Sequence, residues 1–215
     1  MKTLSHVDTW IFDLDNTLYH PSCRLFDQMH VRMSDFIIQQ FGVDEAEAKR
    51  RRHYFYVKYG TTLRGLMVEH ALDPTAFLDY VHDIDYATVP ANQHLGAALD
   101  KLPGRKLVFT NGTVGHAQRV LDRLGCATHF EAIYDIVDSD YIPKPDQRPY
   151  EKFLATHGVE PTRAAFFEDL SENLLVPRSI GMATVLVGKH DEALLPAHVD
   201  YVTDDLADFL HGVLK

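Results

Sequence analysis

The feature that most constrains this chain is a set of short, uniformly apolar runs, each followed by polar or glycine-containing residues and then by a helical stretch. The runs cover residues 7–12, 106–110, 164–168 and 183–187. Strands this apolar are typically buried on both faces, as in a parallel sheet that helices cover on both sides. Residues 201–203 can add a short final strand.

Helical spacing of apolar residues follows most of these runs. The predicted helices cover residues 92–101, 116–124, 146–157, 171–180 and 205–214. Gly125 and Gly158 stand where a helix ends, a common place for glycine. The alternation predicts an α/β fold with a doubly wound, Rossmann-like parallel sheet.

One interval is too long for a single connection. A strand–helix–strand crossover needs about 30 residues, yet the second run begins more than 90 residues after the first ends. The interval itself reads as helical at 25–41, at 45–59 behind the N-cap residue Asp44, and at 62–71 and 74–82. We therefore predict an all-helical domain at 17–89, inserted into an α/β core made of residues 1–16 and 90–215.

Composition limits the partners. The 215 residues carry 31 acidic and 21 basic side chains, a formal net charge of -10, which argues against binding to nucleic acid or to an anionic membrane surface. Acids interrupt the N-terminal segment early, and no run approaches the ~18 apolar residues of a membrane span. We expect a cytoplasmic protein, and both a monomer and a dimer remain open.

Suggestive polar residues gather where the predicted strands end, which is where open α/β sheets bind ligands. The segments are Asp13-Leu14-Asp15-Asn16-Thr17, Thr110-Asn111-Gly112, Lys144-Pro145, and Glu168-Asp169 with Asn173. Several carboxylates in one cleft repel one another unless a cation joins them. Oxygen ligands with open positions favour Mg²⁺ bridging to a phosphate, and a lysine with Thr and Asn can hold the phosphate oxygens.

These four motifs, in this order, resemble those of the haloacid dehalogenase superfamily. The resemblance implies that Asp13 attacks phosphorus to form an aspartyl-phosphate, while Asp15 protonates the leaving oxygen and later activates water. It also implies that phosphoryl oxygens are held by the Thr110-Asn111-Gly112 segment, and that Lys144 pairs with both nucleophile and phosphate.

The same resemblance implies the metal ligands. They would be Asp169, the Asp13 carboxylate and the backbone carbonyl of Asp15, with Glu168 and Asn173 behind them. Asp15 also favours phosphate esters over carbon–halogen bonds, because a halide leaving group needs no acid.

The superfamily resemblance implies that the helical domain at 17–89, directly after the first motif, is a cap domain over a catalytic core. Its segment from Tyr54 to Leu66 resembles the cap of the pyrimidine 5'-nucleotidase group. The resemblance implies a pyrimidine nucleoside monophosphate as substrate, with Tyr59 and Arg64 as the substrate-binding residues of the cap. One departure is the sequence Glu168-Asp169-Leu170-Ser171, where that group often reads Asp-Asp-Ser. Three alternatives remain: a phosphatase for a sugar phosphate or another small phosphorylated metabolite, a phosphomutase, and a catalytically idle domain that binds a phosphorylated ligand.

Overall fold

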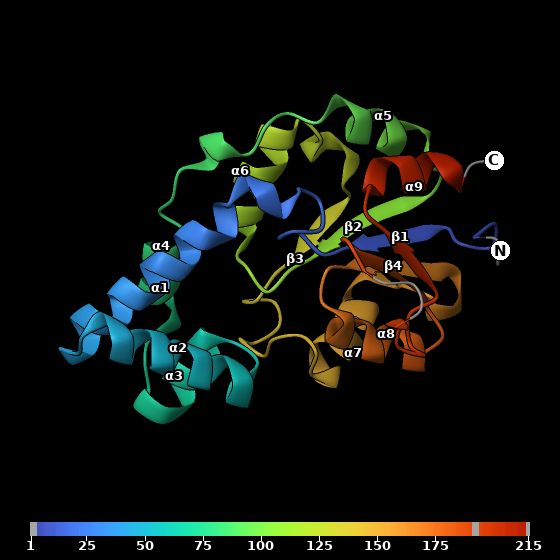
Figure 1. Ribbon diagram of the computed structural model, residues 1–215. Helices are drawn as coiled ribbons and strands as arrows, with labels where there is room; N and C mark the ends of the chain where they lie inside the picture. Colours follow the sequence, from blue (N-terminus) through green and yellow to red (C-terminus); the bar gives the residue numbers. More distant parts are fainter. Residues whose placement is uncertain (1–3, 191–193, 214–215) are drawn as a thin grey trace.

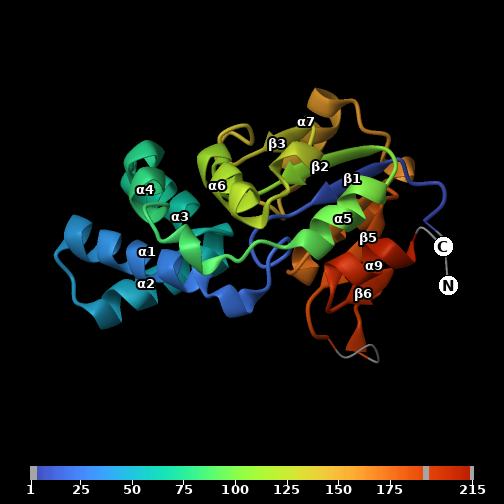
Figure 2. The ribbon, with the colours of Figure 1, turned by 90° about the horizontal axis from the view of Figure 1, so that it is seen from above.

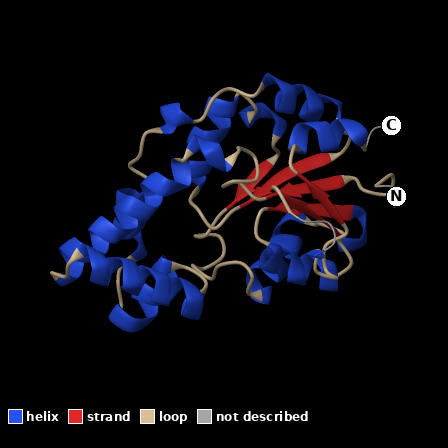
Figure 3. Ribbon diagram, viewed as in Figure 1, coloured by secondary structure: helices blue, strands red, loops and turns tan. Residues whose placement is uncertain are grey.

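The computed structural model describes residues 4–190 and 194–213. Its centre is a six-stranded sheet in the order β3-β2-β1-β4-β5-β6, and every neighbouring pair is parallel. Figure 3 shows the strands side by side, with helices above and below them. The strands are β1 (Thr9–Phe12), β2 (Arg105–Phe109), β3 (Ala132–Tyr134), β4 (Ala164–Glu168), β5 (Ala183–Val187) and β6 (Tyr201–Thr203).

Helices cover the two faces of the sheet with separate apolar cores (Figure 1). Phe12 and Phe167 point to one face, whereas Ile11 and Phe166 point to the other, as the period of two along a strand requires. The first face is covered by α5 (Gln93–Lys101), α6 (Val114–Leu124) and α9 (Leu206–Gly212). The second is covered by α7 (Gln147–His157) and α8 (Leu175–Ser179). The predicted doubly wound α/β fold is confirmed.

Four helices lie in the region predicted as the cap and share an apolar cluster, which includes Met29, Phe55, Leu66 and Phe77 together with Ile136 of the core. They are α1 (Leu25–Phe41), α2 (Glu45–Tyr59), α3 (Thr62–His70) and α4 (Pro74–Val81). Figure 2 shows them as a group to one side of the sheet. Single 3-10 turns lie at Pro21–Cys23, Tyr86–Thr88, Ala127–His129 and Pro161–Arg163.

Two elements differ from the sequence prediction. Strand β3 was not predicted, because its three residues at the sheet edge are too few for a strand pattern. The single helix predicted at 171–180 is a 3-10 turn, Ser171–Leu174, followed by α8. Pro177 has no N–H to bond the Asn173 carbonyl, and that oxygen instead accepts the Tyr150 hydroxyl at 2.7 Å.

The other predicted helices and strands are present, with ends that shift by one or two residues. Leu214, at the end of the last predicted helix, lies outside the described residues. No helix within the described part of the chain combines the length and apolar character that a membrane crossing requires.

Candidate active site

The site is built around Lys144, whose side chain is buried between two carboxylates. Its Nζ donates to Asp13 Oδ1 at 2.8 Å, to Glu168 Oε2 at 2.7 Å and to the Phe109 carbonyl at 2.9 Å. Asp13 follows β1, Phe109 ends β2 and Glu168 ends β4, so three neighbouring strands meet at this ammonium group. Its three protons therefore all have acceptors.

Negative charge is concentrated beside Lys144. One carboxylate oxygen each from Asp13, Glu168 and Asp169 lie within 4.8 Å of one another. Burial, followed by the charge of Glu168, raises the pKa of Asp13 to about 7. Burial likewise raises the pKa of Glu168 to about 7 and that of Asp169 to about 6. Three carboxylate ligands that repel one another fit a hard divalent cation, and these residues provide the oxygen donors that such an ion needs.

Asp15 lies outside this cluster, although it is only two residues from Asp13. Its Oδ1 accepts the Tyr19 hydroxyl at 2.6 Å and lies 2.9 Å from Nε2 of His116 on α6. Burial alone would raise the pKa of Asp15, but the His116 charge and the bonds from His116 and Tyr19 hold it below its ordinary value. The turn directly after Asp15 passes through Asn16, whose φ of 61° lies in the left-handed region.

The turn after β2 lies beside the same cluster. The Thr110 hydroxyl accepts the Gly112 N–H at 2.9 Å, which shapes the turn. The Asn111 side chain bonds the backbone of Lys144 instead: its Oδ1 accepts the Lys144 N–H at 2.9 Å. Asn111 thus fixes the loop that carries Lys144, and its amide group does not point freely into the cleft. The predicted contacts of Thr110, Asn111 and Gly112 with phosphate remain predictions.

Asn173 is buried in the 3-10 turn after β4, where its backbone oxygen accepts the Tyr150 hydroxyl. We predicted that the Asn173 side chain supports the metal ligands. Among the described residues it makes no hydrogen bond to them, so this role stays a prediction. Thr17, by contrast, donates to Asp13 Oδ2 at 3.2 Å. Both oxygens of Asp13 therefore have a hydrogen-bond partner.

The cap reaches the site through the turn between α2 and α3. A side chain at Gly60 would meet Pro143 Cγ at 3.1 Å, so the cap backbone lies against the residue preceding Lys144. Tyr59, predicted to bind substrate, donates its hydroxyl to Glu69 on α3 at 2.6 Å. The Tyr59 hydroxyl is thereby bonded to another residue of the cap.

Two further cap side chains, Arg64 and Tyr56, interact electrostatically with acidic groups of the core. The bond from Arg148 is the main cause that lowers the pKa of Asp146, and the charge of Arg64 adds to it. Burial raises the pKa of Tyr56, and the charges of Glu172, Asp169 and Glu168 raise it further. Tyr56 therefore lies within electrostatic range of the acidic residues after β4.

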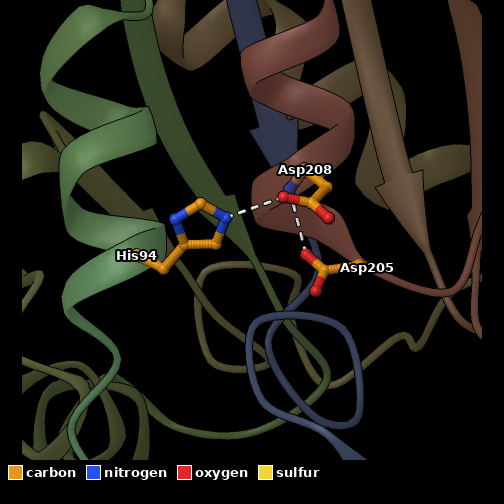
Figure 4. Close-up of side chains that lie close together, drawn as sticks. All are labelled: His94, Asp205 and Asp208. Atoms are coloured by element: carbon orange, nitrogen blue, oxygen red, sulfur yellow. Dashed lines mark hydrogen bonds and ion pairs between the residues drawn. The ribbon is translucent and has the colours of Figure 1, made fainter.

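A second set of possible metal ligands lies away from this cleft, at His94, Asp205 and Asp208 (Figure 4). All three are exposed. Asp205 accepts the Asp208 N–H at 2.9 Å and thereby caps α9, while Asp208 pairs with His94 of α5 at 2.8 Å. Helix capping and an ion pair between two helices account for the cluster.

Sequence reasoning missed His116 and Tyr56 as residues of the site. The thirteen histidines show no ligand spacing, and nothing in sequence distinguishes His116 from the others except its place just after Thr110-Asn111-Gly112. Tyr56 stands in a run of aromatic residues, and the sequence does not show which of them faces the core.

The comparison with protein families decides the class. The model of the haloacid dehalogenase-like hydrolases matches residues 7–181. The chain belongs to this family. The match includes both the cap and all four strand-end segments described above.

Relatives of this haloacid dehalogenase-like hydrolase include phosphate metabolism protein 8 of Saccharomyces cerevisiae, 30% identical over 196 residues. The alignment covers 82% of this chain but 60% of the yeast protein, so the chain spans less than two thirds of that relative.

Solved structures share the fold at low sequence identity. One is a haloacid dehalogenase-like family hydrolase from Streptococcus pneumoniae, with a TM-score of 0.66 at 17% identity over 98% of this chain and all of that one. A phosphatase of the family from Thermococcus onnurineus gives 0.65 at 18% over 97% and 98%. An L-2-haloacid dehalogenase from Xanthobacter autotrophicus gives 0.60 at 15% over the same shares.

Proposed function

We propose that this hydrolase is a Mg²⁺-dependent phosphomonoesterase that acts through an aspartyl-phosphate on Asp13. The observation that carries the proposal is the contrast between two aspartates at the end of β1. Asp13 faces Lys144 and the acidic cluster, whereas Asp15 is turned to Tyr19 and His116. A carboxyl held apart from the cluster is available to protonate a leaving oxygen, which a halide would not need.

In this proposal Asp13 is the nucleophile, and Lys144 orients its carboxylate. Covalent catalysis divides hydrolysis into two easier displacements. Asp15 protonates the leaving oxygen in the first and takes a proton from water in the second. Thr110 and the backbone of Asn111 and Gly112 hold the phosphoryl oxygens.

Asp13, Asp169 and the Asp15 carbonyl would hold Mg²⁺, with Glu168 behind them. The bound ion would offset the negative charge that phosphate brings to a cluster of carboxylates.

The proposed cap domain, residues 17–89, would select the substrate. Arg64 and Tyr56 support a pyrimidine nucleoside monophosphate, because an aromatic ring can stack on a base and a guanidinium group can reach its carbonyl oxygens. The yeast relative is named for phosphate metabolism, which agrees with phosphate chemistry but not with one particular substrate.

Phosphate release from a panel of esters tests the proposal. Uridine and cytidine monophosphates should be hydrolysed with Mg²⁺ present, and Asp13→Asn should abolish the reaction. Activity that persists in Asp13→Asn would remove Asp13 from its role. Tyr56→Ala should raise KM for pyrimidine monophosphates, while Val57→Ala, its exposed neighbour on the same helix, should leave KM unchanged.

The panel also separates the alternatives. Preference for a sugar phosphate or another small metabolite would assign the cap a different substrate. Conversion of isomers without phosphate release would indicate a mutase. Binding of phosphorylated ligands without turnover of any ester would indicate an idle domain.

A further inference from the structure

We propose that His116 is a positioning residue that fixes the rotation of the Asp15 carboxyl, so that one oxygen is held by the protein and the other is left for the leaving group. The inference rests on the proposed function, because it assigns a partner to the group that protonates the leaving oxygen. It concerns a histidine with no place in the four motifs.

The contacts around His116 are complete on both ring nitrogens. Its side chain is fully buried. Nε2 lies 2.9 Å from Asp15 Oδ1, and Nδ1 lies 2.9 Å from the Tyr86 hydroxyl oxygen. The imidazole thus connects Asp15, after β1, to the segment that joins the cap to α5.

Hydrogen positions follow from the chemistry of these partners. The Tyr86 hydroxyl lies 3.0 Å from the His82 carbonyl, which can only accept, so the tyrosine proton points there. The Tyr86 oxygen must then accept from His116 Nδ1–H. Since Nδ1 carries a proton, a single proton remains between Nε2 and Asp15 Oδ1, whichever of the two holds it.

A second ring prevents His116 from turning. The imidazole of His82, at the end of α4, stacks on it with centroids 4.6 Å apart and planes 17° from parallel. His82 Nδ1 also lies 3.2 Å from the Thr113 hydroxyl, which caps α6 by accepting the His116 N–H at 3.2 Å. The backbone N–H of His116, one face of its ring and both of its ring nitrogens are therefore all in contact with neighbouring groups.

These contacts determine how the two oxygens of the Asp15 carboxyl group are placed. Tyr19 and His116 both bond Oδ1, and among the described residues no group bonds Oδ2. That second oxygen lies on the side of Gly112, in the turn proposed to hold phosphate. The arrangement presents Oδ2 to a leaving oxygen and keeps the Asp15 side chain out of the acidic cluster.

The test compares two esters that differ in their need for an acid. A nitrophenyl phosphate has a good leaving group, whereas a nucleoside 5'-monophosphate or another alkyl phosphate has a poor one. The measured quantity is kcat/KM, because it reports the first displacement, in which the leaving group departs. A loss of packing alone would lower kcat/KM equally for both esters.

His116→Asn can keep the bond to Tyr86, but its side chain is too short to reach Asp15. We expect it to lower kcat/KM for the alkyl ester by on the order of 10²-fold, and for the nitrophenyl ester by no more than about 3-fold. His116→Gln, whose amide reaches the position of Nε2, should recover most of the loss. Equal losses for the two esters, no loss, or a glutamine variant as impaired as the asparagine variant would overturn the assignment.

A matched control and a second variant complete the design. His129→Asn removes a similar histidine, which pairs with Asp100 at 2.9 Å far from the cleft, and should leave both rates unchanged. If His116→Asn does not fold, Tyr86→Phe keeps His116 but removes its Nδ1 partner, and should give a weaker loss with the same leaving-group dependence. Failure of the wild-type protein to hydrolyse either ester would refute the proposed function, whereas an unselective loss would refute only the role of His116.

Discussion

The replacement Lys144→Met tests how the buried charges of the site are balanced. Methionine is similar in length but removes the ammonium group and its bonds to Asp13, Glu168 and Phe109. Two carboxyl groups would then remain buried without a cation. Removing one partner from a buried ion pair costs about 3–5 kcal/mol of stability, and we expect a loss of this size at pH 8.

The loss should depend on pH, and linkage gives its sign. Without Lys144, the folded variant retains at least one proton on Asp13 or Glu168 that the wild-type protein releases. Each extra proton bound by the folded state lowers stability by about 1.4 kcal/mol per pH unit. The wild-type protein itself releases these protons only as the pH passes about 7, so the cost of the replacement should grow by about 1.4 kcal/mol between pH 6 and pH 8 for each carboxyl group that stays protonated in the variant. At pH 6 protonation of the two carboxyl groups takes little free energy, because burial already raises the pKa of each to about 7.

Urea unfolding at the two pH values, with chelator present, measures the free energy of unfolding. The control is Lys152→Met, which removes a lysine that pairs with Asp140 at 2.7 Å on the surface. Water screens that pair, so the control should unfold like the wild-type protein at both pH values. A cost for Lys144→Met that matches the control, or that is the same at pH 6 and pH 8, would refute this account.

Three further predictions concern packing, cation binding and the loop of Lys144. Gly65→Ala should cost about 1–3 kcal/mol in thermal unfolding, because its methyl group would lie 2.5 Å from Phe55 Cγ. Gly96→Ala within α5 should stabilise by up to about 1 kcal/mol, because its methyl group would meet only His129 Cε1, at 4.0 Å. The cation-free protein should lose stability as pH rises from about 4 to 7, since its buried acids bind protons that the unfolded chain has released, and the rise in Tm with Mg²⁺ should therefore be larger at pH 8 than at pH 5. Asn111→Ala should lower the free energy of unfolding by about 1 kcal/mol, through loss of its bond to the Lys144 backbone.

Much of the fold was predictable, because its signals are local. Strands β4 and β5 have the bounds that their apolar runs predicted, and α1 and α2 match their periodic stretches. A strand of three residues such as β3 depends on the neighbour that it pairs with, and a run this short carries no pattern of its own. The same holds for the interrupted helix at Pro177, where the donor to the Asn173 carbonyl is the Tyr150 hydroxyl, more than twenty residues away.

The site shows the same division. Asp13, Glu168 and Asp169 were candidates because they stand at the ends of predicted strands, and Lys144 because it stands just before the helix predicted at 146–157. The structure places their charged groups together. The contact of His116 with Asp15 could not be predicted, since it joins residues 101 positions apart through packing of α6 against the sheet.

The pKa directions of the two aspartates indicate what the proposed cation and substrate would change. Without a cation, Asp13 has a pKa raised to about 7 and Asp15 has one below its ordinary value. The proposed chemistry requires the reverse, with an ionised nucleophile and a protonated acid. A divalent cation beside Asp13 favours its ionised form, and the negative charge of a phosphate ester beside Asp15 favours its protonated form. Cation and substrate together therefore set the two groups for the first displacement, and neither does so alone.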